Sequence, residues 1–323
     1  MGFMAILTTQ KSKSVAQVAE EKLIEIIVRS LGRACPPFPA GPGGDCAIIP
    51  QTEKAKFRVS TIDSVILGRH FDSSCSGSLA GKKLVERNLS DLAAAGAKPK
   101  DALLSLFIGP NVNLAWLKDF AQAVGRAASR AGMNINGGDV CRVQAGQFSA
   151  TLSVQGFSQR ILTRTTCQAG DRLFVTGELG GSLLGHHCHF RARVAEGLWL
   201  AQQKSTTACT DLSDGMLKDL SGLIGKKWDA MVDTEKLPLR PAAHQMAKKD
   251  GRSALEHALQ DGEDYELLFC VKAKDASSFA QKFQKQFPKT RLSEIGFIKK
   301  GEGLVRSVKD KQPLLGKGFS HFA

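Results

Sequence analysis

The sequence predicts a mixed α/β protein built from two domains. A chain of 323 residues is long enough for more than one hydrophobic core. Helix-spaced apolar patterns and short apolar runs alternate in both halves of the chain, as they do in α/β and α+β domains. The composition, 42% hydrophobic and 23% charged, is that of an ordinary globular protein. We place the boundary so that residues 1–158 form an N-terminal domain and residues 159–323 a C-terminal domain.

The N-terminal half contains three helix patterns, each followed or closed by a glycine. In the clearest one, Leu114, Leu117 and Phe120 recur on one helical face, and Gly132 follows the last turn. The proline- and glycine-rich residues 37–44 indicate a loop. The expected helices cover 13–32, 79–95 and 114–131, and the expected strands cover 46–50, 57–67, 102–109 and 149–157.

The C-terminal half repeats this alternation. The helix expected over 216–224 follows an Asp214-Gly215 turn, in which the aspartate is a candidate N-cap. From Lys299 the chain is basic, and we expect a loop that ends in aromatic residues. The other expected elements are strands over 173–176 and 265–271 and helices over 195–203 and 276–287.

The composition narrows the classes of function. The net charge of +13 is spread along the chain and no nucleic-acid-recognition signature accompanies it, so a nucleic-acid partner is not expected. The same charge favours a polyanionic small substrate such as ATP. No apolar run approaches the roughly 18 residues of a membrane helix, and Met1 to Leu7 is too short for the core of a signal peptide. We therefore expect a cytoplasmic protein without a membrane partner.

Several common site motifs are missing from the sequence. The eight cysteines are scattered singly without a C-x-x-C pair, so we expect free thiols and no zinc ribbon. Residues 222–227 lack the spacing and the hydroxyl residue of a P-loop. No G-x-S-x-G elbow provides an acyl-transfer serine. Residues 186–189 contain three histidines that cannot all ligate one metal from regular structure, and we expect an exposed loop there.

The most informative pattern is a set of aspartates, each beside small residues at the end of an apolar run. They are Asp45, Asp63, Asp91, Asp139, Asp211 and Asp214. If these carboxylates gather in the folded chain, mutual repulsion raises their pKa values unless cations lie between them. Magnesium prefers oxygen ligands and usually keeps waters and substrate phosphates in its shell. Gly-Gly-Asp, at 43–45 and 137–139, is typical of turns whose backbone a phosphate can approach closely.

Longer motifs connect these aspartates to a known family. In order, they are N-L-S-D-L-A-A-A-G-A over 88–97, G-G-D over 137–139, D-L-S-D-G over 211–215 and G-E-D-Y-E-L over 262–267. Together they closely resemble the thiamine-monophosphate kinase family, within the superfamily of aminoimidazole-ribonucleotide synthetase-like ATP enzymes. The resemblance runs from about residue 20 to the end of the chain.

The resemblance implies a fold and a reaction. It implies a two-domain aminoimidazole-ribonucleotide synthetase-like subunit that forms a homodimer, with N-terminal sheets pairing at the interface. It implies direct transfer of the γ-phosphoryl group of ATP to thiamine monophosphate, giving thiamine diphosphate and ADP. Magnesium is the implied metal, and potassium is a further ion that often helps members of the family.

The resemblance also assigns roles to single residues. Magnesium contacts are implied for Asp45, Thr61, Asp63, Asp91, Asp139, Asp211 and Asp214. Nucleotide contacts are implied for Gly138, Arg164 and Ser213, and contacts with the acceptor substrate for His70, Glu263 and Phe319. A catalytic base is not expected, because the acceptor phosphate is already anionic and metal-assisted in-line transfer suffices. A carboxylate and an aromatic face suit the cationic thiazolium ring.

Departures from the family pattern leave an alternative open. Gly44 stands where the family has a first aspartate, and Ile62 replaces a polar residue before Asp63. Val140 and Cys141 replace the usual threonines. These changes motivate the alternative of a catalytically impaired nucleotide-binding paralogue that acts as a sensor or scaffold. That alternative predicts ATP binding without turnover.

Overall fold

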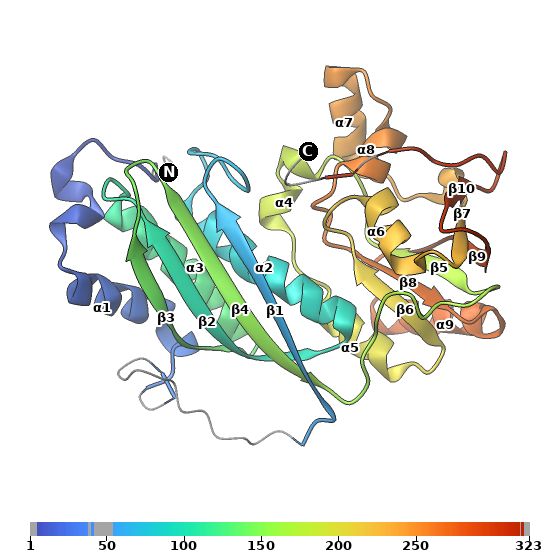
Figure 1. Ribbon diagram of the computed structural model, residues 1–323, viewed down its shortest axis with the longest axis horizontal. Coiled ribbons are helices and arrows are strands. Elements are labelled where there is room, and N and C mark those ends of the chain that lie inside the picture. The colour runs from blue at the N-terminus through green and yellow to red at the C-terminus, as the bar shows by residue number, and fades with distance from the viewer. Residues whose placement is uncertain (1–4, 38–39, 42–53, 317, 320–323) are drawn as a thin grey trace. The chain divides into compact units, whose positions relative to one another are not determined.

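The computed structural model describes residues 5–37, 40–41, 54–316 and 318–319. The chain divides into two compact units (Figure 1). The N-terminal unit comprises Met1–Leu89 and Lys98–Gln159, and the C-terminal unit comprises Ser90–Ala97 and Arg160–Ala323. The domain boundary that the sequence predicts between residues 158 and 159 stays a prediction. Among the described residues, no helix is both long and apolar enough to cross a membrane.

The N-terminal unit is built on a four-stranded sheet in the order β1-β4-β2-β3 (Figure 1). The central strand β4 is antiparallel to both neighbours, whereas β2 and β3 are parallel. The strands are β1 (Phe57–Ile66), β2 (Lys98–Ile108), β3 (Asn134–Arg142) and β4 (Phe148–Ser158). The helices are α1 (Glu20–Leu31), α2 (Gly77–Ala95) and α3 (Leu114–Arg130), with 3₁₀ turns at Lys11–Lys13, Val15–Gln17 and Gly32–Ala34.

The core of this unit lies on the face of the sheet that α2 and α3 cover (Figure 1). Along β4 the side chains alternate between buried and half-buried, as expected for a strand with one covered face. On the covered side, Trp116 and Phe120 of α3 stack at 5.6 Å, and Phe148 meets both edge-on. These rings carry much of the apolar burial that holds the helices on the sheet.

Two expectations for this unit need correction. The first helix begins at Glu20 and not near residue 13, because 3₁₀ turns occupy the preceding segment. Residues 137–139 lie within strand β3 and do not form a turn. Gly138 is required there because an added Cβ would lie 1.7 Å from the carbonyl oxygen of Leu104. The strand expected over 46–50 lies outside the described residues.

The C-terminal unit contains a six-stranded sheet in the order β10-β7-β9-β5-β8-β6. Only the β10–β7 pairing is parallel among the pairs in this sheet. The strands are β5 (Arg172–Thr176), β6 (Thr206–Asp211), β7 (Trp228–Val232), β8 (Leu267–Val271), β9 (Leu292–Lys300) and β10 (Val305–Ser307). The α-helices are α4 (His186–His189), α5 (Val194–Gln202), α6 (Met216–Ile224), α7 (Pro241–Asp250), α8 (Ala254–Gln260) and α9 (Ala276–Gln286). Short 3₁₀ turns occupy Ser182–Leu184, Thr234–Lys236 and Ala273–Asp275.

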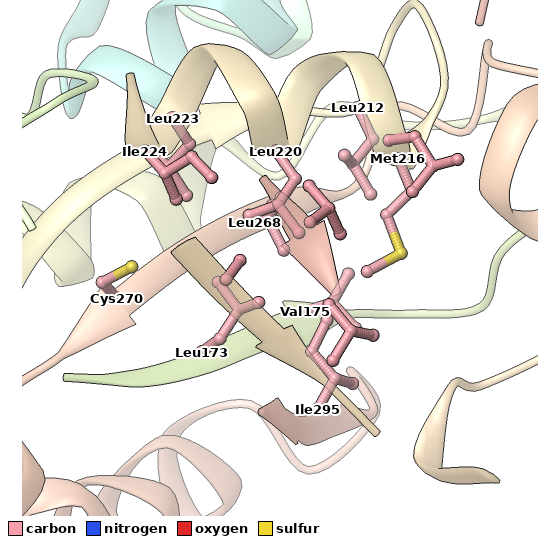
Figure 2. Packing of buried hydrophobic residues seen from close by; sticks show 14 of the residues in the cluster. Leu173, Val175, Leu212, Met216, Leu220, Leu223, Ile224, Leu268, Cys270 and Ile295 are labelled. Carbon is pink, nitrogen blue, oxygen red and sulfur yellow. The ribbon is translucent and has the colours of Figure 1, made fainter. Parts of the chain in front are cut away.

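Helices cover both faces of this sheet. On one face, Met216, Leu220 and Leu223 of α6 pack against strand residues such as Val175 and Leu268 (Figure 2). On the other face, α5 and α9 pack against alternate residues of the same strands, including Phe174 and Phe269. Burial on both faces explains why β8 is apolar throughout. The packing of α6 fixes the loop that precedes it, which carries the D-L-S-D-G motif.

The structure corrects three expectations for the C-terminal half. The strand expected from residue 265 begins at Leu267, because Tyr265 has a positive φ of 51°. The segment after Lys299 is not all loop, since strand β10 forms within it. Residues 186–189 form a short helix in which Cys188 is buried, and not an exposed loop.

Candidate functional site

The candidate site residues fall into two sets, one in each unit. The N-terminal unit carries Thr61, Asp63, His70, Gly138 and Asp139. The C-terminal unit carries Asp91, Arg164, Asp211, Ser213, Asp214, Glu263 and Phe319. Asp45 lies outside the described residues.

In the C-terminal unit, backbone hydrogen bonds join two motifs that lie about 50 residues apart in the sequence. The amide of Glu263 donates to the Ser213 carbonyl at 2.8 Å, and the amide of Tyr265 donates to the Leu212 carbonyl at 2.8 Å. Leu212 in turn donates to the carbonyl of Glu266 at 2.9 Å. The D-L-S-D-G and G-E-D-Y-E-L loops therefore form one structural piece, which we call the loop junction (residues 211–215 and 262–266).

The loop junction depends on an unusual backbone. Gly262 has a φ of 74°, and an added Cβ would lie 2.7 Å from the Ser213 carbonyl oxygen. Glu263 and Tyr265 also have positive φ values, 56° and 51°, which non-glycine residues rarely adopt. Such conformations cost on the order of 1–3 kcal/mol each and persist only where surrounding contacts impose them. Here the backbone bonds and the stacking of Phe190 on Tyr265, with ring centroids 4.0 Å apart, impose them.

Phe319, the last residue that the structure describes, is bonded to the same loop junction. The amide of Phe319 donates to the carbonyl of Asp214 at 2.8 Å. Lys218 donates to the carbonyl of Phe319 at 2.7 Å and also pairs with the Asp214 carboxylate at 2.6 Å. Four of the sequence-predicted residues, Ser213, Asp214, Glu263 and Phe319, are thus brought together by backbone contacts. Asp214 is not the N-cap of α6, because Gly215 occupies that position.

Carboxylates cluster at the start of α6. Asp211 is buried and accepts a hydrogen bond from the Ser90 hydroxyl at 2.8 Å, which connects it to the residue beside Asp91. The amide of Asp214 donates to Asp219 at 3.0 Å. Burial, followed by the negative charge of Asp211, raises the pKa of Asp219 to about 8, and Asp214 adds to this rise. The negative charges of Asp211 and Asp214 thus both act on Asp219, and a cation bound beside them would relieve this repulsion.

Arg164 lies near the same helix. Its positive charge opposes the rise in the pKa of Asp219. Its guanidinium also lies 3.6 Å from the position that a side chain at Gly222 would take. The next residue, Thr165, has a positive φ of 62° and donates its amide to the Leu223 carbonyl at 2.8 Å. The exposed guanidinium of Arg164 is thus held beside α6 by a fixed backbone.

One neighbour of Glu263 comes from residues 186–189, for which the sequence predicted only an exposed loop. His187 lies 3.2 Å from the Glu263 carboxylate through its Nδ1 atom. The adjacent Asp264 is buried, pairs with Arg240 at 2.8 Å and accepts the Gly180 amide. Burial raises the pKa of Asp264 to about 6, and the Arg240 charge opposes that rise. Asp264 anchors the loop, whereas Glu263 is the half-buried carboxylate of the pair.

In the N-terminal unit, Thr61 and Asp63 alternate on strand β1 with Ile62 between them. Asp63 and the buried Val65 point to the same face of the sheet, the one that α2 covers. Arg87 of α2 pairs with the Asp63 carboxylate at 3.2 Å and also donates to the Ser64 carbonyl at 2.8 Å. A candidate metal ligand is therefore already paired with a half-buried cation of the chain.

His70 is almost fully buried in the turn after β1. Its Nδ1 accepts the amide of Ile66 at 3.1 Å, and its own amide donates to the Ile66 carbonyl at 2.9 Å. Because Nδ1 accepts a hydrogen bond, the proton of the neutral ring lies on Nε2. His70 is therefore arranged as a hydrogen-bond donor through Nε2.

Asp139 and Asp63 lie on the two opposite edge strands of this sheet. Strands β4 and β2 lie between β1 and β3. At a spacing of roughly 4.8 Å per strand, β1 and β3 are therefore about 14 Å apart. Asp139 is exposed and accepts a hydrogen bond from the Cys141 thiol at 2.9 Å. Gly138 and Asp139 line a cavity of about 140 Å³ between β3 and α1. A second cavity, of about 280 Å³, follows along β3 beside Cys141 and Arg142.

These donor sets fit magnesium as a partly hydrated ion. Among the described residues, no group of three or more His, Cys, Asp or Glu side chains is arranged so that it could hold a metal ion. Magnesium does not need such a group, because it is usually held by one or two carboxylates with waters and phosphates. Asp211 and Asp214, whose charges both act on Asp219, would offer carboxylate oxygens to such an ion.

The sequence analysis did not predict a role for Asp219 or Arg87, nor the contact of His187 with Glu263. Asp219 follows Asp214 by five residues on an amphipathic helix, and only the fold shows its carboxylate turned back to the Asp214 amide. Arg87 directly precedes the N-L-S-D motif, and this position could have marked it as a candidate site residue. Its pairing with Asp63 on β1 could not have been predicted from the sequence. His187 lies 76 positions from Glu263 (263 minus 187), and no local pattern connects them.

Comparison with known proteins identifies relatives over most of the chain. Residues 43–158 match the family model described as AIR synthase related protein, N-terminal domain. The chain is 35% identical over 276 residues to a thiamine-monophosphate kinase of Rhodopirellula baltica, covering 83% of this chain and 87% of that one. It is 31% identical over 310 residues to the thiamine-monophosphate kinase of Salmonella typhimurium, covering 88% and 92%.

Solved structures agree with this relationship. A thiamine-monophosphate kinase from Stenotrophomonas maltophilia K279a superposes with a TM-score of 0.74 at 28% identity, covering 90% of this chain and 96% of that one. A structure described as AaThiL complexed with AMPPCP and TMP superposes with a TM-score of 0.72 at 26% identity, covering 95% and 98%. The hydrogenase maturation protein HypE in complex with ATP reaches 0.74 at 16% identity, which shows the shared fold alone.

Proposed function

The chain belongs to the thiamine-monophosphate kinase family, and we infer that it transfers the γ-phosphoryl group of ATP to the phosphate of thiamine monophosphate. The products are thiamine diphosphate and ADP. The observation that carries this inference is the loop junction, where backbone hydrogen bonds join Ser213, Asp214, Glu263 and Phe319. Relatives that share the length of the chain carry the kinase name, so the alternative of a non-catalytic sensor is not favoured.

The C-terminal carboxylates are suited to hold magnesium on the phosphates. Asp211 and Asp214, with Asp91 beside Ser90, are the ligands that we assign to the metal in this unit. Bound magnesium would supply positive charge that neutralises the repulsion between two anionic substrates. Asp219 holds the Asp214 amide, and this fixes the backbone from which the Asp214 carboxylate projects. In the N-terminal unit, Thr61, Asp63 and Asp139 are assigned the same role, and so is Asp45, on the family resemblance alone.

The remaining C-terminal residues divide between the two substrates. Arg164 is exposed beside α6 and is suited to a charge-assisted contact with a nucleotide phosphate. Ser213 lies within the loop junction and offers a hydroxyl to the same phosphates. Glu263 and Phe319 present a carboxylate and a ring, which match the positive charge and the flat face of a thiazolium. His187 already lies beside Glu263, so a cationic substrate must share that carboxylate with an imidazole.

The N-terminal residues complete the assignments. Gly138 is exposed on β3 and lines the cavity of about 140 Å³ between β3 and α1, and we assign it a contact with the nucleotide there. His70 directs its Nε2 proton as a donor to an anionic acceptor phosphate. A general base is not required, because the attacking phosphate oxygen is already anionic. Potassium is included as an accessory ion on the family resemblance.

We extend the assignment to a homodimer formed through the open face of the N-terminal sheet. Ile62, Leu103 and Ile66 are 65%, 50% and 42% exposed on that face, opposite the side covered by α2 and α3. Exposed apolar groups that share one sheet face favour association. Light scattering after size exclusion is expected to give twice the mass of the chain, and Ile62→Glu is expected to give monomers. A monomeric wild-type protein would contradict this assignment.

We place the reaction in the cytoplasm. The seven described cysteines are all free thiols, which is typical of proteins in a reducing compartment. ATP, the proposed phosphoryl donor, is a substrate of that compartment. Fractionation of cells that carry a tagged chain is expected to recover the kinase with cytoplasmic markers.

A direct assay tests the proposed function. Purified protein is incubated with ATP, Mg²⁺ and thiamine monophosphate, and ADP and thiamine diphosphate are separated and quantified. We expect equal amounts of the two products, no thiamine diphosphate when EDTA is present, and no product from unphosphorylated thiamine. Nucleotide binding without thiamine diphosphate would overturn the proposal and favour the sensor alternative.

A further inference from the structure

We propose that Lys83 is a positioning residue for the acceptor substrate, acting through His70. The inference rests on the proposed function, in which His70 contacts the acceptor phosphate. Lys83 belongs to none of the sequence-predicted sets, yet it is among the largest fully buried side chains of the described chain, at 0% exposure. It lies on α2, and its ammonium donates to the carbonyl oxygen of His70 at 2.8 Å.

A fully buried ammonium group is costly and therefore informative. Removing a charged amine from water is unfavourable unless hydrogen bonds and nearby charges compensate. An apolar side chain of similar length would fill the same volume under the packed turn without that cost. The retained charge is thus placed beside the one residue of this turn to which we assign a substrate contact.

His70 and Lys83 make different contributions to binding an anion: His70 donates a hydrogen bond, and Lys83 provides positive charge. His70 cannot carry the positive charge cheaply, because its Nδ1 accepts the Ile66 amide and would have to give up that bond on protonation. The neutral ring instead directs one proton from Nε2. Lys83 supplies the positive charge through its ammonium group, which is bonded to the carbonyl oxygen of His70. The bond from Lys83 also fixes the peptide that orients the ring.

Other contacts hold the turn independently of Lys83. Gly68 donates to the carbonyl of Phe71 at 2.8 Å, and Phe71 packs on Trp116 at 6.0 Å and Phe148 at 6.3 Å. Replacement of Lys83 is therefore expected to loosen the His70 ring without unfolding the unit. This separates a positioning role from a purely structural one.

The test compares K83M with K83Q and with K82M, a control at the adjacent half-buried lysine of the same helix. Methionine removes the donor and the charge, whereas glutamine keeps an N–H donor. We expect K83M to raise the KM for thiamine monophosphate roughly tenfold while the KM for ATP stays within about twofold. K83Q is expected to recover part of this loss, and K82M to behave as wild type.

Two further readouts make the result decisive. In an H70A background, K83M is expected to add less than about twofold to the acceptor KM, because residues that act through one another are not additive. In ligand-free protein, ¹⁵N spectra of the His70 ring are expected to show one Nε2–H tautomer in wild type and K83Q and an altered ring in K83M. Additive effects of H70A and K83M, equal losses for both substrates, or an unchanged His70 ring in K83M would overturn the inference.

Failure of the proposed function is distinguishable from failure of this inference. If the wild-type protein makes no thiamine diphosphate, the assignment of the substrate is wrong, and the acceptor measurements do not apply. The His70 ring spectra are independent of turnover, so they still decide whether Lys83 positions His70. If K83M fails to fold, K83Q carries the test, since loss of charge with retention of the donor is expected to raise the acceptor KM by an intermediate amount.

Discussion

The two units arrange their candidate residues in different ways. In the C-terminal unit, Ser213, Asp214, Glu263 and Phe319 are joined by backbone hydrogen bonds between loops. In the N-terminal unit, Asp63 and Asp139 lie on outer strands of one sheet with two strands between them. Loops can bring distant sequence positions into one place, whereas a strand order fixes its residues at multiples of the strand spacing. The C-terminal set is therefore the better-defined site within one chain.

The largest expected effect is on the C-terminal carboxylates. Asp211→Asn and Asp214→Asn each remove a charge at the metal site and are expected to lower turnover by about 10²- to 10³-fold, as for loss of one electrostatic stabiliser. Asp139→Asn, at the exposed edge of the N-terminal sheet, is expected to lower it by roughly tenfold because solvent screens its charge. Steady-state assays measure the rates and thermal unfolding confirms the fold. Equal losses at all three positions would remove the contrast between the units.

The next effect concerns the geometry of the loop junction. Gly262→Ala places a Cβ 2.7 Å from the Ser213 carbonyl oxygen at a φ of 74°. We expect a loss of about 2–4 kcal/mol of stability and a fall in activity larger than the loss of folded protein explains. Gly146→Ala is the matched control in the other unit, since it also has a positive φ but open space around it. If both variants lose the same amount of stability and neither loses activity beyond its loss of folded protein, the geometry of the loop junction has no role in activity.

A smaller effect is expected in the pH dependence of stability. The pKa of Asp219 is raised to about 8 in the fold, above its ordinary value of 3.8, so the folded state holds this proton more tightly than the unfolded state. The resulting stability is fully present below about pH 4 and is lost as the pH rises to about 8. We expect Asp219→Asn to flatten this decline, by about 0.5–1 kcal/mol per pH unit, in metal-free chemical denaturation. Parallel curves for wild type and variant would contradict the account of the carboxylate cluster.

The smallest effect is on the metal requirement of the N-terminal unit. Arg87 pairs with Asp63 at 3.2 Å and therefore competes with a divalent cation for that carboxylate. Arg87→Met is expected to lower the Mg²⁺ concentration for half-maximal activity by about twofold to threefold. Manganese binding measured by electron paramagnetic resonance gives the same comparison without turnover. Arg130→Met, which removes the partner of Glu86 in the same unit, is the control expected to change nothing.

Much of the fold follows from the sequence, because its patterns are strong. Helix α6 begins and ends where its apolar spacing predicts, at Met216 and Ile224. Strand β3 was missed because two glycines read as a turn, although the backbone of Leu104 requires Gly138 in the strand. Strand β10 is only three residues long and follows a basic segment, so local pattern alone gives little signal.

The candidate site was predictable where a motif contains its own chemistry. Asp211, Asp214 and Glu263 stand in motifs whose order identifies the family, and backbone hydrogen bonds join the two loops that follow Asp211 and carry Asp214 and Glu263. Partners from other elements were not predictable, because tertiary contacts create them. The pairing of Arg87 with Asp63 and the bond from Lys83 to His70 each depend on how α2 packs on the sheet.

The most direct test of the central claim is a crystal structure with Mn²⁺, a non-hydrolysable ATP analogue and thiamine monophosphate. Anomalous scattering locates the manganese ions without assumptions about the ligands. We predict peaks that contact both phosphate oxygens and the carboxylates of Asp211 or Asp214, with the acceptor beside Glu263. Metal and nucleotide bound elsewhere, with these carboxylates still paired only to protein groups, would contradict the account.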